Sequence, residues 1–261
     1  MQIKPKKSLG QNFLIDKNIL KKISDSVKID SNSNILEIGP GTGNLTYFII
    51  KKNPKKIFLI EKDKNLSKFL KEKFNENVTI FNEDFINFKN KSFLADNLII
   101  IGNLPYNISS QILVKLIINK EKFKYKELIF MFQKELADRI LSEESSKNYG
   151  RLSILSNWKF NIKKIIDINP NSFFPKPKVK STLLSFVPKK DLFKFNNVEN
   201  LEYVTRIFFN QRRKKIKKPL SILFSNEKNL INKLNLNLDL RPQNLSKEAF
   251  FKITKEYENL L

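Results

Sequence analysis

The chain has 261 residues, of which 41% are hydrophobic, enough for one large α/β domain and a small appended one. It has no cysteine and no histidine, which excludes a thiolate nucleophile, an imidazole base and the usual soft metal sites. The net charge of +23 favours a polyanionic partner such as nucleic acid, although a genome biased towards A+T would also produce a chain crowded with Lys, Asn, Ile and Phe. No apolar run reaches membrane-spanning length and the amino terminus lacks the apolar core of a secretory signal, so we expect a cytoplasmic protein without a membrane segment.

The amino-terminal part combines a basic stretch, residues 4–7, with the polar pair Gln11 and Asn12. After Asp16, apolar residues recur at spacings of one, three and four, which predicts a helix with Asp16 as its N-cap. Gln11 and Asn12 are therefore expected in the loop before this helix. Such a pair can also be an ordinary solvated turn. The predicted apolar face consists of Ile19, Leu20, Ile23 and Val27.

A glycine-rich turn follows the first predicted strand, residues 34–38. The turn reads Gly39-Pro40-Gly41-Thr42-Gly43 and leads into a predicted helix over residues 44–52. A strand, a glycine turn and a helix bring backbone close to a ligand at the start of a βαβ unit. The dinucleotide fingerprint would require glycine where this chain has Asn44 or Thr46, so NAD binding is disfavoured.

Acidic residues follow the next two predicted strands. Glu61 comes directly after residues 56–60, about 20 residues beyond the glycines, where a carboxylate can accept both ribose hydroxyls of a nucleoside. Asp84 follows residues 78–81 and can accept a hydrogen bond from the exocyclic amine of an adenine. Each acid alone could be a solvated strand end. The order of the glycines, the two acids and the next motif is what indicates a site.

The fourth predicted strand, residues 98–101, is an apolar run rich in β-branched residues and is expected to be buried. Asn103, Leu104, Pro105 and Tyr106 are expected in a loop at its carboxyl end, where open α/β sheets bind ligands. The proline stiffens the loop and biases the residue before it towards extended geometry. An amide oxygen, a backbone carbonyl and an aromatic ring held in this way suit a flat base that carries an amino group.

Several segments spread over nearly the whole chain also form a familiar set. They are residues 10–14 (GQNFL), 36–43 (LEIGPGTG), 102–109 (GNLPYNIS), 133–135 (QKE), 149–153 (YGRLS), 174–181 (FPKPKVKS) and 209–214 (FNQRRK). Together they resemble the ribosomal RNA adenine dimethyltransferases. The glycine turn is shared by most methyltransferases, whereas the first and last segments narrow the resemblance to enzymes that dimethylate two adjacent adenines near the 3′ end of small-subunit rRNA.

The resemblance implies an α/β fold, the class I S-adenosylmethionine-dependent methyltransferase fold, with a Rossmann-like, seven-stranded, mostly parallel sheet and a small all-helical C-terminal domain. We expect the fifth strand at residues 127–133 and the last two around residues 161–168 and 181–187.

A domain boundary is expected where Pro188 and several lysines follow the last strand. The predicted domains are residues 1–190, which bind S-adenosylmethionine, and residues 191–261, a helical domain that contacts the rRNA. Within the second domain, helical periodicity at residues 197–210 and 245–260 predicts two helices, with Ser246 as a cap.

By resemblance, the chain is an S-adenosylmethionine-dependent 16S rRNA (adenine-N6,N6)-dimethyltransferase with a role in small-subunit biogenesis. Its expected partner is small-subunit rRNA within a pre-30S particle, and we expect a monomer that needs no metal. The implied cofactor-binding residues are Gln11, Asn12, Leu14, Gly39, Gly41, Glu61, Asp84 and Asn103.

The expected chemistry has to overcome two obstacles, because the N6 lone pair of adenine is delocalised into the ring and the base sits inside stacked RNA. We expect the base to be turned out and held against Tyr106, with Phe173 or Phe174 as the opposing wall. The Asn103 oxygen and the Leu104 carbonyl would accept the two N6 hydrogens. Alignment then supplies most of the acceleration, and no strong base is required.

The basic run Arg212, Arg213, Lys214 and Lys215 is predicted to contact rRNA phosphates, although it could also be a solvated helix face. Rival functions are a large-subunit rRNA adenine N6-methyltransferase, a DNA amino-methyltransferase, and an RNA-binding assembly or transcription factor on a methyltransferase scaffold. The carboxyl-terminal segment argues against the first. Leu104 argues against the second, because DNA enzymes more often have a second proline there. Intact Gly39, Glu61, Asp84 and Asn103 argue against the third.

Overall fold

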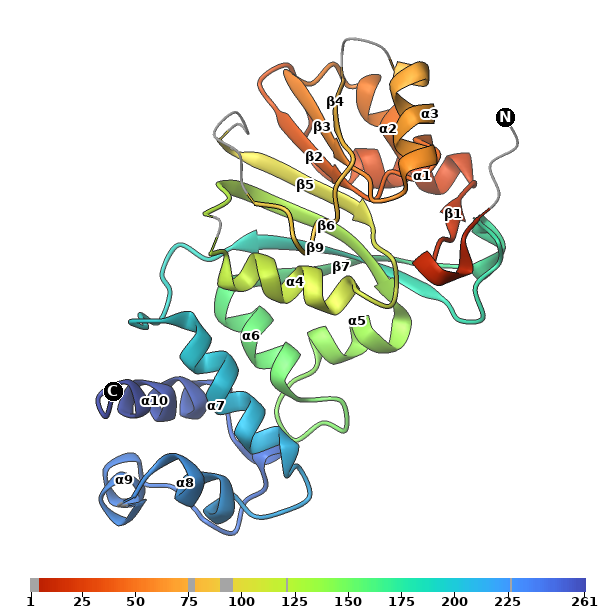
Figure 1. The fold of residues 1–261 in the computed structure, drawn as a ribbon. Helices are drawn as coiled ribbons and strands as arrows, with labels where there is room; N and C mark the ends of the chain where they lie inside the picture. Colours follow the sequence, from red (N-terminus) through yellow and green to blue (C-terminus); the bar gives the residue numbers. More distant parts are fainter. Residues whose placement is uncertain (1–4, 75–77, 90–95, 121, 226) are drawn as a thin grey trace. The chain divides into compact units, whose positions relative to one another are not determined.

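The computed structural model describes residues 5–74, 78–89, 96–120, 122–225 and 227–261, which form two compact units (Figure 1). The first unit contains residues 1–137 and 162–188, and the second contains residues 138–161 and 189–261. The second unit therefore includes a stretch that lies before the last two strands in sequence. A single cut near residue 190 does not describe this division, and the assignment of the two domains to separate tasks remains a prediction.

The first unit contains a seven-stranded sheet in the order β4-β3-β2-β5-β6-β9-β7 (Figure 1). The pairs β2–β3, β3–β4, β2–β5 and β5–β6 are parallel, whereas β6–β9 is antiparallel. The predicted mostly parallel sheet is therefore confirmed. The strands are β2 (Asn34–Ile38), β3 (Lys56–Ile60), β4 (Val78–Phe81), β5 (Leu98–Asn103), β6 (Tyr125–Gln133), β7 (Phe160–Ile168) and β9 (Ser181–Pro188).

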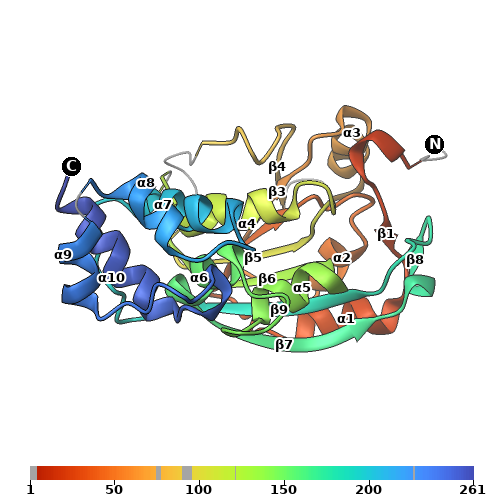
Figure 2. The same cartoon turned by 90° about the horizontal axis from the view of Figure 1, so that it is seen from below.

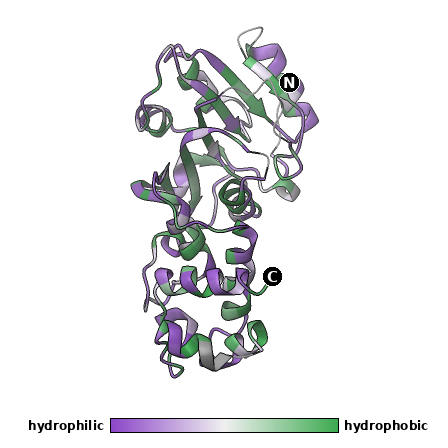
Figure 3. Ribbon diagram, turned by 90° about the vertical axis from the view of Figure 1, so that its left-hand side faces the viewer, coloured by the Kyte–Doolittle hydropathy of each residue, from purple (hydrophilic) through white to green (hydrophobic). Residues whose placement is uncertain are grey.

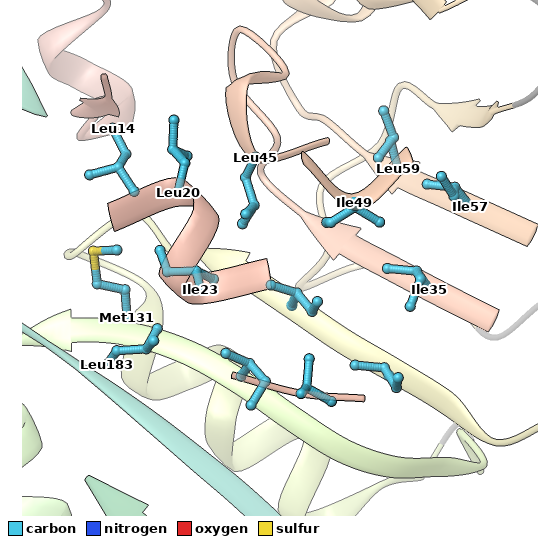
Figure 4. Packing of buried hydrophobic residues seen from close by; sticks show 14 of the residues in the cluster. Leu14, Leu20, Ile23, Ile35, Leu45, Ile49, Ile57, Leu59, Met131 and Leu183 are labelled. Carbon is cyan, nitrogen blue, oxygen red and sulfur yellow. The ribbon is translucent and has the colours of Figure 1, made fainter. Parts of the chain in front are cut away.

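Three helices cover one face of the sheet: α1 (Lys17–Asp25), α2 (Asn44–Ile50) and α3 (Lys64–Phe74). Asp16 caps α1 as predicted, because its carboxylate accepts hydrogen bonds from two backbone amides of the first turn. Side chains alternate along a strand, so every second residue of β2, β3 and β5 packs against these helices. Figure 4 shows this core. Its labelled side chains are Leu14, Leu20, Ile23, Ile35, Leu45, Ile49, Ile57, Leu59, Met131 and Leu183.

Helix α4 (Ser109–Ile118) lies on the opposite face of the sheet from α1, as Figure 2 shows. Its sequence is apolar on more than one side, which fits a helix buried against a sheet. Helix α5 (Lys134–Leu141) follows β6 directly. A second, two-stranded sheet pairs β1 (Phe13–Leu14) with β8 (Phe173–Phe174) in antiparallel register. This small sheet was not predicted.

The second unit is helical. Its helices are α6 (Arg151–Lys159), α7 (Val198–Asn210), α8 (Lys217–Leu223), α9 (Glu227–Leu234) and α10 (Lys247–Glu258), and the chain also has 3-10 turns at Lys7–Leu9, Pro170–Ser172 and Pro242–Asn244. The predicted helices at residues 197–210 and 245–260 are confirmed. Ser246 caps α10, because its hydroxyl accepts from the Ala249 amide at 3.1 Å. Figure 3 shows hydrophilic and hydrophobic residues alternating along these helices, as expected for helices with one buried stripe. None of the helices within the described residues is long and apolar enough to cross a membrane.

Candidate active site

A pocket in the first unit lies where β2, β3 and β5 end, at the carboxyl edge of the sheet. Such an edge is where open α/β sheets bind ligands. All of the predicted cofactor-binding and catalytic residues line this pocket, although they come from segments up to about ninety residues apart along the chain. They are Gln11, Asn12, Leu14, Gly39, Gly41, Glu61, Asp84, Asn103, Leu104, Pro105 and Tyr106. The roles assigned to them remain predictions.

The glycine turn closes tightly over the end of β2. Gly41 has a φ of +59°, and a Cβ at this position would lie 2.8 Å from the Phe13 ring. A side chain here would therefore be strained and would collide with the amino-terminal segment. The Gly41 amide donates to Glu61 Oε2 at 3.1 Å, so the turn is fastened to the acid that ends the next strand. Bare backbone beside a buried carboxylate fits a nucleoside without a pyrophosphate.

Glu61 is 6% exposed and is held by backbone amides at both of its oxygens. Its Oε1 accepts from the Asp63 amide at 2.8 Å, while Oε2 accepts from Gly41. Burial raises the pKa of the Glu61 carboxyl, although the two amide hydrogen bonds oppose that rise. Each carboxylate oxygen has two lone pairs, so both can still accept a hydroxyl from a ligand.

Glu37 is a site residue that the sequence analysis missed. It lines the pocket from inside β2, is 2% exposed, and its Oε2 accepts from the Thr46 hydroxyl of α2 at 2.6 Å. Burial raises the pKa of Glu37 to about 7, and the charge of Glu61 adds to the rise. The available signal was an acid inside an otherwise apolar strand directly before the glycine turn.

Asp84 lines the pocket, and its Oδ2 forms an ion pair with Lys62 Nζ at 2.9 Å. Burial alone would raise the pKa of Asp84, but the hydrogen bond and charge of Lys62 outweigh it, so the pKa lies below its usual value. The carboxylate is therefore ionised at neutral pH and able to accept from an amine. Phe85, which follows it and is buried, also lines the pocket and was likewise not predicted.

Asn103 is the last residue of β5, which corrects the expectation that it lies in the loop after the strand. The parallel ladder to β6 continues through Gly102 and Asn103, whose partner is Met131. A Cβ on Gly102 would lie 2.8 Å from the Ile38 carbonyl, so only glycine lets β5 approach β2 this closely. The side-chain nitrogen of Asn103, Nδ2, donates to the Asn12 carbonyl at 2.8 Å. This bond leaves its oxygen oriented as an acceptor on rigid strand backbone.

Tyr106 stands beside Asn103 with its ring partly buried. Its hydroxyl shares a hydrogen bond of 2.6 Å with Ser181, the first residue of β9. Burial raises the pKa of this phenol, so it is neutral at physiological pH. The hydrogen bond holds the hydroxyl end of the ring in place, which suits a stacking surface.

The two candidate phenylalanines are adjacent residues of β8. Their environments differ because successive side chains of a strand point to opposite faces. Phe173 is 3% exposed and belongs to the hydrophobic core, where it pairs across the small sheet with Leu14. Phe174 points to the other side and is 58% exposed. Phe174 is therefore the accessible ring of the two, but neither residue lines the pocket, and contact of either ring with a target base remains a prediction.

The four residues of the predicted basic run differ in their partners and exposure. Arg212 donates to the Gln243 side chain and to the Lys147 carbonyl, so it fastens loops of the second unit together. Lys215 forms an exposed ion pair with Asp239 at 2.6 Å. Arg213 and Lys214 are exposed. Contact between this run and RNA remains a prediction, and these last two side chains suit it best.

Comparisons with known proteins agree with this geometry. The model of a family described as ribosomal RNA adenine dimethylase matches residues 2–259. The chain is 52% identical to a ribosomal RNA small subunit methyltransferase A of Pelagibacter ubique (strain HTCC1062), over 100% of this chain and 99% of that protein. It is similar in structure to a dimethyladenosine transferase from Plasmodium falciparum, with a TM-score of 0.77, 29% identity, and coverage of 95% of this chain and 98% of that one.

A second solved structure, the 23S rRNA methyltransferase ErmE, has a TM-score of 0.68 and 20% identity, with 95% of this chain and 99% of that chain covered. At this identity the similarity concerns the fold alone. Both neighbours confirm the class I methyltransferase fold predicted from the sequence.

Proposed function

Because the chain belongs to the ribosomal RNA adenine dimethylase family and is therefore an S-adenosylmethionine-dependent enzyme, we propose that it dimethylates N6 of two adjacent adenines near the 3′ end of small-subunit rRNA. One observation carries this proposal. The segment from Asn103 to Tyr106 lines the same pocket as the glycine turn and Glu61, so a nucleoside-type donor and a flat amino-bearing base can meet there.

The residues present fit S-adenosylmethionine, which when bound supplies an electrophilic methyl group on a sulfonium. Glu61 would accept from the ribose hydroxyls, since it is buried yet fastened by backbone amides. Asp84 would accept from the adenine amine of the donor. Gln11, Asn12 and Leu14 would enclose the donor from the amino-terminal segment, together with the backbone at Gly39 and Gly41.

The target amine would be handled by two acceptors on the β5 end. The Asn103 side-chain oxygen and the Leu104 carbonyl would each accept one N6 hydrogen, which draws the nitrogen towards pyramidal geometry and localises its lone pair. The Leu104 side chain is 1% exposed, so the residue is anchored by its side chain and contributes through its backbone. The acceptors need no reorganisation as the methyl moves, so positioning supplies most of the acceleration.

The target base would be held outside its helix between two rings. The hydroxyl end of the Tyr106 ring is held by Ser181, and Phe174 is exposed on β8 of the same unit. Stacking of a base on an aromatic face contributes about 1–3 kcal/mol, which offsets the cost of turning the base out.

We further propose that the enzyme acts as a monomer on a pre-30S particle in the cytoplasm, during small-subunit biogenesis. The adenine pair lies in rRNA, and the chain carries a net charge of +23 that favours a large polyanion. The similarity to ErmE does not favour large-subunit rRNA as the substrate, because it extends to the fold alone.

The test is to incubate the purified protein and S-adenosylmethionine with ribosomal subunits from cells that lack the gene, and to map dimethyladenosine by mass spectrometry. We expect two adjacent dimethyladenosines in small-subunit rRNA and none in large-subunit rRNA. Methylation of large-subunit rRNA would favour the rival enzyme. Binding to small subunits without any methylation would favour an assembly factor.

A further inference from the structure

Asp63 is almost fully buried two residues after Glu61, and its carboxylate has partners from two directions. Oδ1 accepts from the Asn65 amide at 2.9 Å in the first turn of α3. Oδ2 forms an ion pair with Lys6 Nζ at 2.8 Å and accepts from Gln11 Nε2 at 3.4 Å. The Asp63 carboxylate therefore joins the start of helix α3 to the amino-terminal segment, residues 6–14.

This segment runs across the pocket, and residues 8–14 line it. It is attached at its far side as well, because the Asn12 carbonyl accepts from Asn103 at 2.8 Å. Lys6 and Gln11 also bond to each other, since the Lys6 amide donates to Gln11 Oε1 at 2.7 Å. The segment is thus held between Asp63, which follows β3, and Asn103, which ends β5.

We propose that Asp63 is a positioning residue for the methyl donor, and that its bonds to Lys6 and Gln11 hold the amino-terminal segment closed across the donor site. The inference rests on the proposed use of this pocket for S-adenosylmethionine. The Asp63 amide also donates to Glu61 Oε1, so the same residue fixes the ribose acceptor and the segment that covers it. Because Lys6 is 47% exposed, its ion pair can open to admit the donor and close to retain it.

Lys6 provides a test whose sign separates this role from simple electrostatics. S-adenosylmethionine carries a positive sulfonium, so loss of a nearby lysine charge would by itself strengthen binding. If the ion pair holds the segment closed, Lys6→Met instead weakens binding. We expect Lys6→Met and Asp63→Asn each to raise the dissociation constant of S-adenosylmethionine about tenfold, chiefly through faster dissociation, in calorimetry and stopped-flow measurements.

The control is Lys52→Met, which also removes a lysine from an ion pair, here with the more exposed Asp25 outside the pocket. This control and Lys6→Arg, which keeps the charge, should stay within about twofold of the original protein. The double variant Lys6→Met/Asp63→Asn should bind no more weakly than the weaker single variant, because both remove one interaction. The KM for S-adenosylmethionine should rise, while kcat at saturating donor and the KM for the subunit stay within about twofold.

Amide hydrogen exchange supplies a second measurement, in which residues 8–14 should exchange faster in Lys6→Met than in Lys52→Met. Unchanged or tighter binding by Lys6→Met would overturn the proposal, and so would weakening by Asp63→Asn alone, which would mean that Asp63 acts through its other partners and that the ion pair with Lys6 does not hold the segment. Additive effects in the double variant would also contradict it. Failure of the unaltered protein to bind S-adenosylmethionine would instead refute the proposed function.

Discussion

At the residue scale, the pocket brings together a polar side chain at the end of β5 and two buried acids. Asn103 is the acceptor whose position is best determined, because it ends a paired strand and its amide nitrogen is bonded to Asn12. Glu37 and Glu61 are both buried, and the charge of Glu61 opposes ionisation of Glu37. The positive charge of a bound donor would offset the negative charge of Glu61. Donor binding is therefore expected to make Glu37 easier to ionise.

Asn103→Ala should lower turnover far more than it lowers cofactor affinity. Its oxygen is proposed to act on the target amine as the methyl moves, an interaction that matters most in the transition state. The variant also loses the bond to the Asn12 carbonyl, so a rise of up to roughly tenfold in the donor dissociation constant is expected. Single-turnover methylation and donor titration measure the two effects separately. A methylation rate close to that of the unaltered protein would remove Asn103 from the reaction.

Glu37 predicts a characteristic dependence of stability on pH in the donor-free protein. Its pKa is about 7 in the folded protein, above the ordinary value of 4.5, so the folded state retains a proton that the unfolded chain loses. The contribution of this group to stability is thus complete below about pH 4.5 and is lost as pH rises towards about 7. A shift of this size corresponds to roughly 3 kcal/mol.

Glu37→Gln should abolish that contribution, because the amide does not titrate. Denaturant unfolding at pH 5 and pH 8 should show the variant gaining stability relative to the original protein at the higher pH. Glu72→Gln, an exposed position on α3, is the control that should show no such change. An equal difference between variant and original at both pH values would mean that Glu37 titrates normally.

At the scale of elements, the sequence predicted the strands of the large sheet best, because each buried strand is a short run of β-branched and apolar residues between turn signals. It also predicted which residues meet, since the carboxyl ends of parallel strands share one edge. The pairing of β1 with β8 could not be predicted: it involves two residues on each side, about 160 positions apart, and has no periodic signal. The burial of Glu37 escaped prediction for a similar reason, because its partner Thr46 lies on a helix packed over the strand.

The two faces of β8 give opposite expectations for adjacent residues. Phe173→Ala should destabilise the fold by about 3–5 kcal/mol, because it leaves a cavity in the core. Phe174→Ala should leave stability nearly unchanged but weaken the handling of the target base, seen as a lower kcat/KM with rRNA particles. Thermal unfolding and methylation assays on the same preparations check both. Full activity in Phe174→Ala would exclude it as the opposing wall to Tyr106.

At the scale of the whole molecule, the net charge of +23 has two possible origins: selection for RNA binding, or the composition of the genome. The structure narrows the question, because Arg212 has internal partners and Lys215 is paired with Asp239, whereas Arg213 and Lys214 are exposed. Exposed charges that bind phosphates add affinity that depends on salt and conveys little sequence information.

Arg213→Gln/Lys214→Gln should therefore weaken binding to the small-subunit particle and make the plot of log affinity against log salt shallower, by roughly 0.7 to 0.9 for each phosphate that the variant no longer neutralises. Donor affinity should not change, since neither residue lines the pocket. The control Lys21→Gln/Lys22→Gln removes the same charge from exposed positions on α1. If both pairs weaken binding equally, only the overall charge matters, and the basic run is no more specific than the rest of the lysine-rich surface. Weakening confined to the Arg213 and Lys214 variant would identify the second unit as a binding surface for the particle.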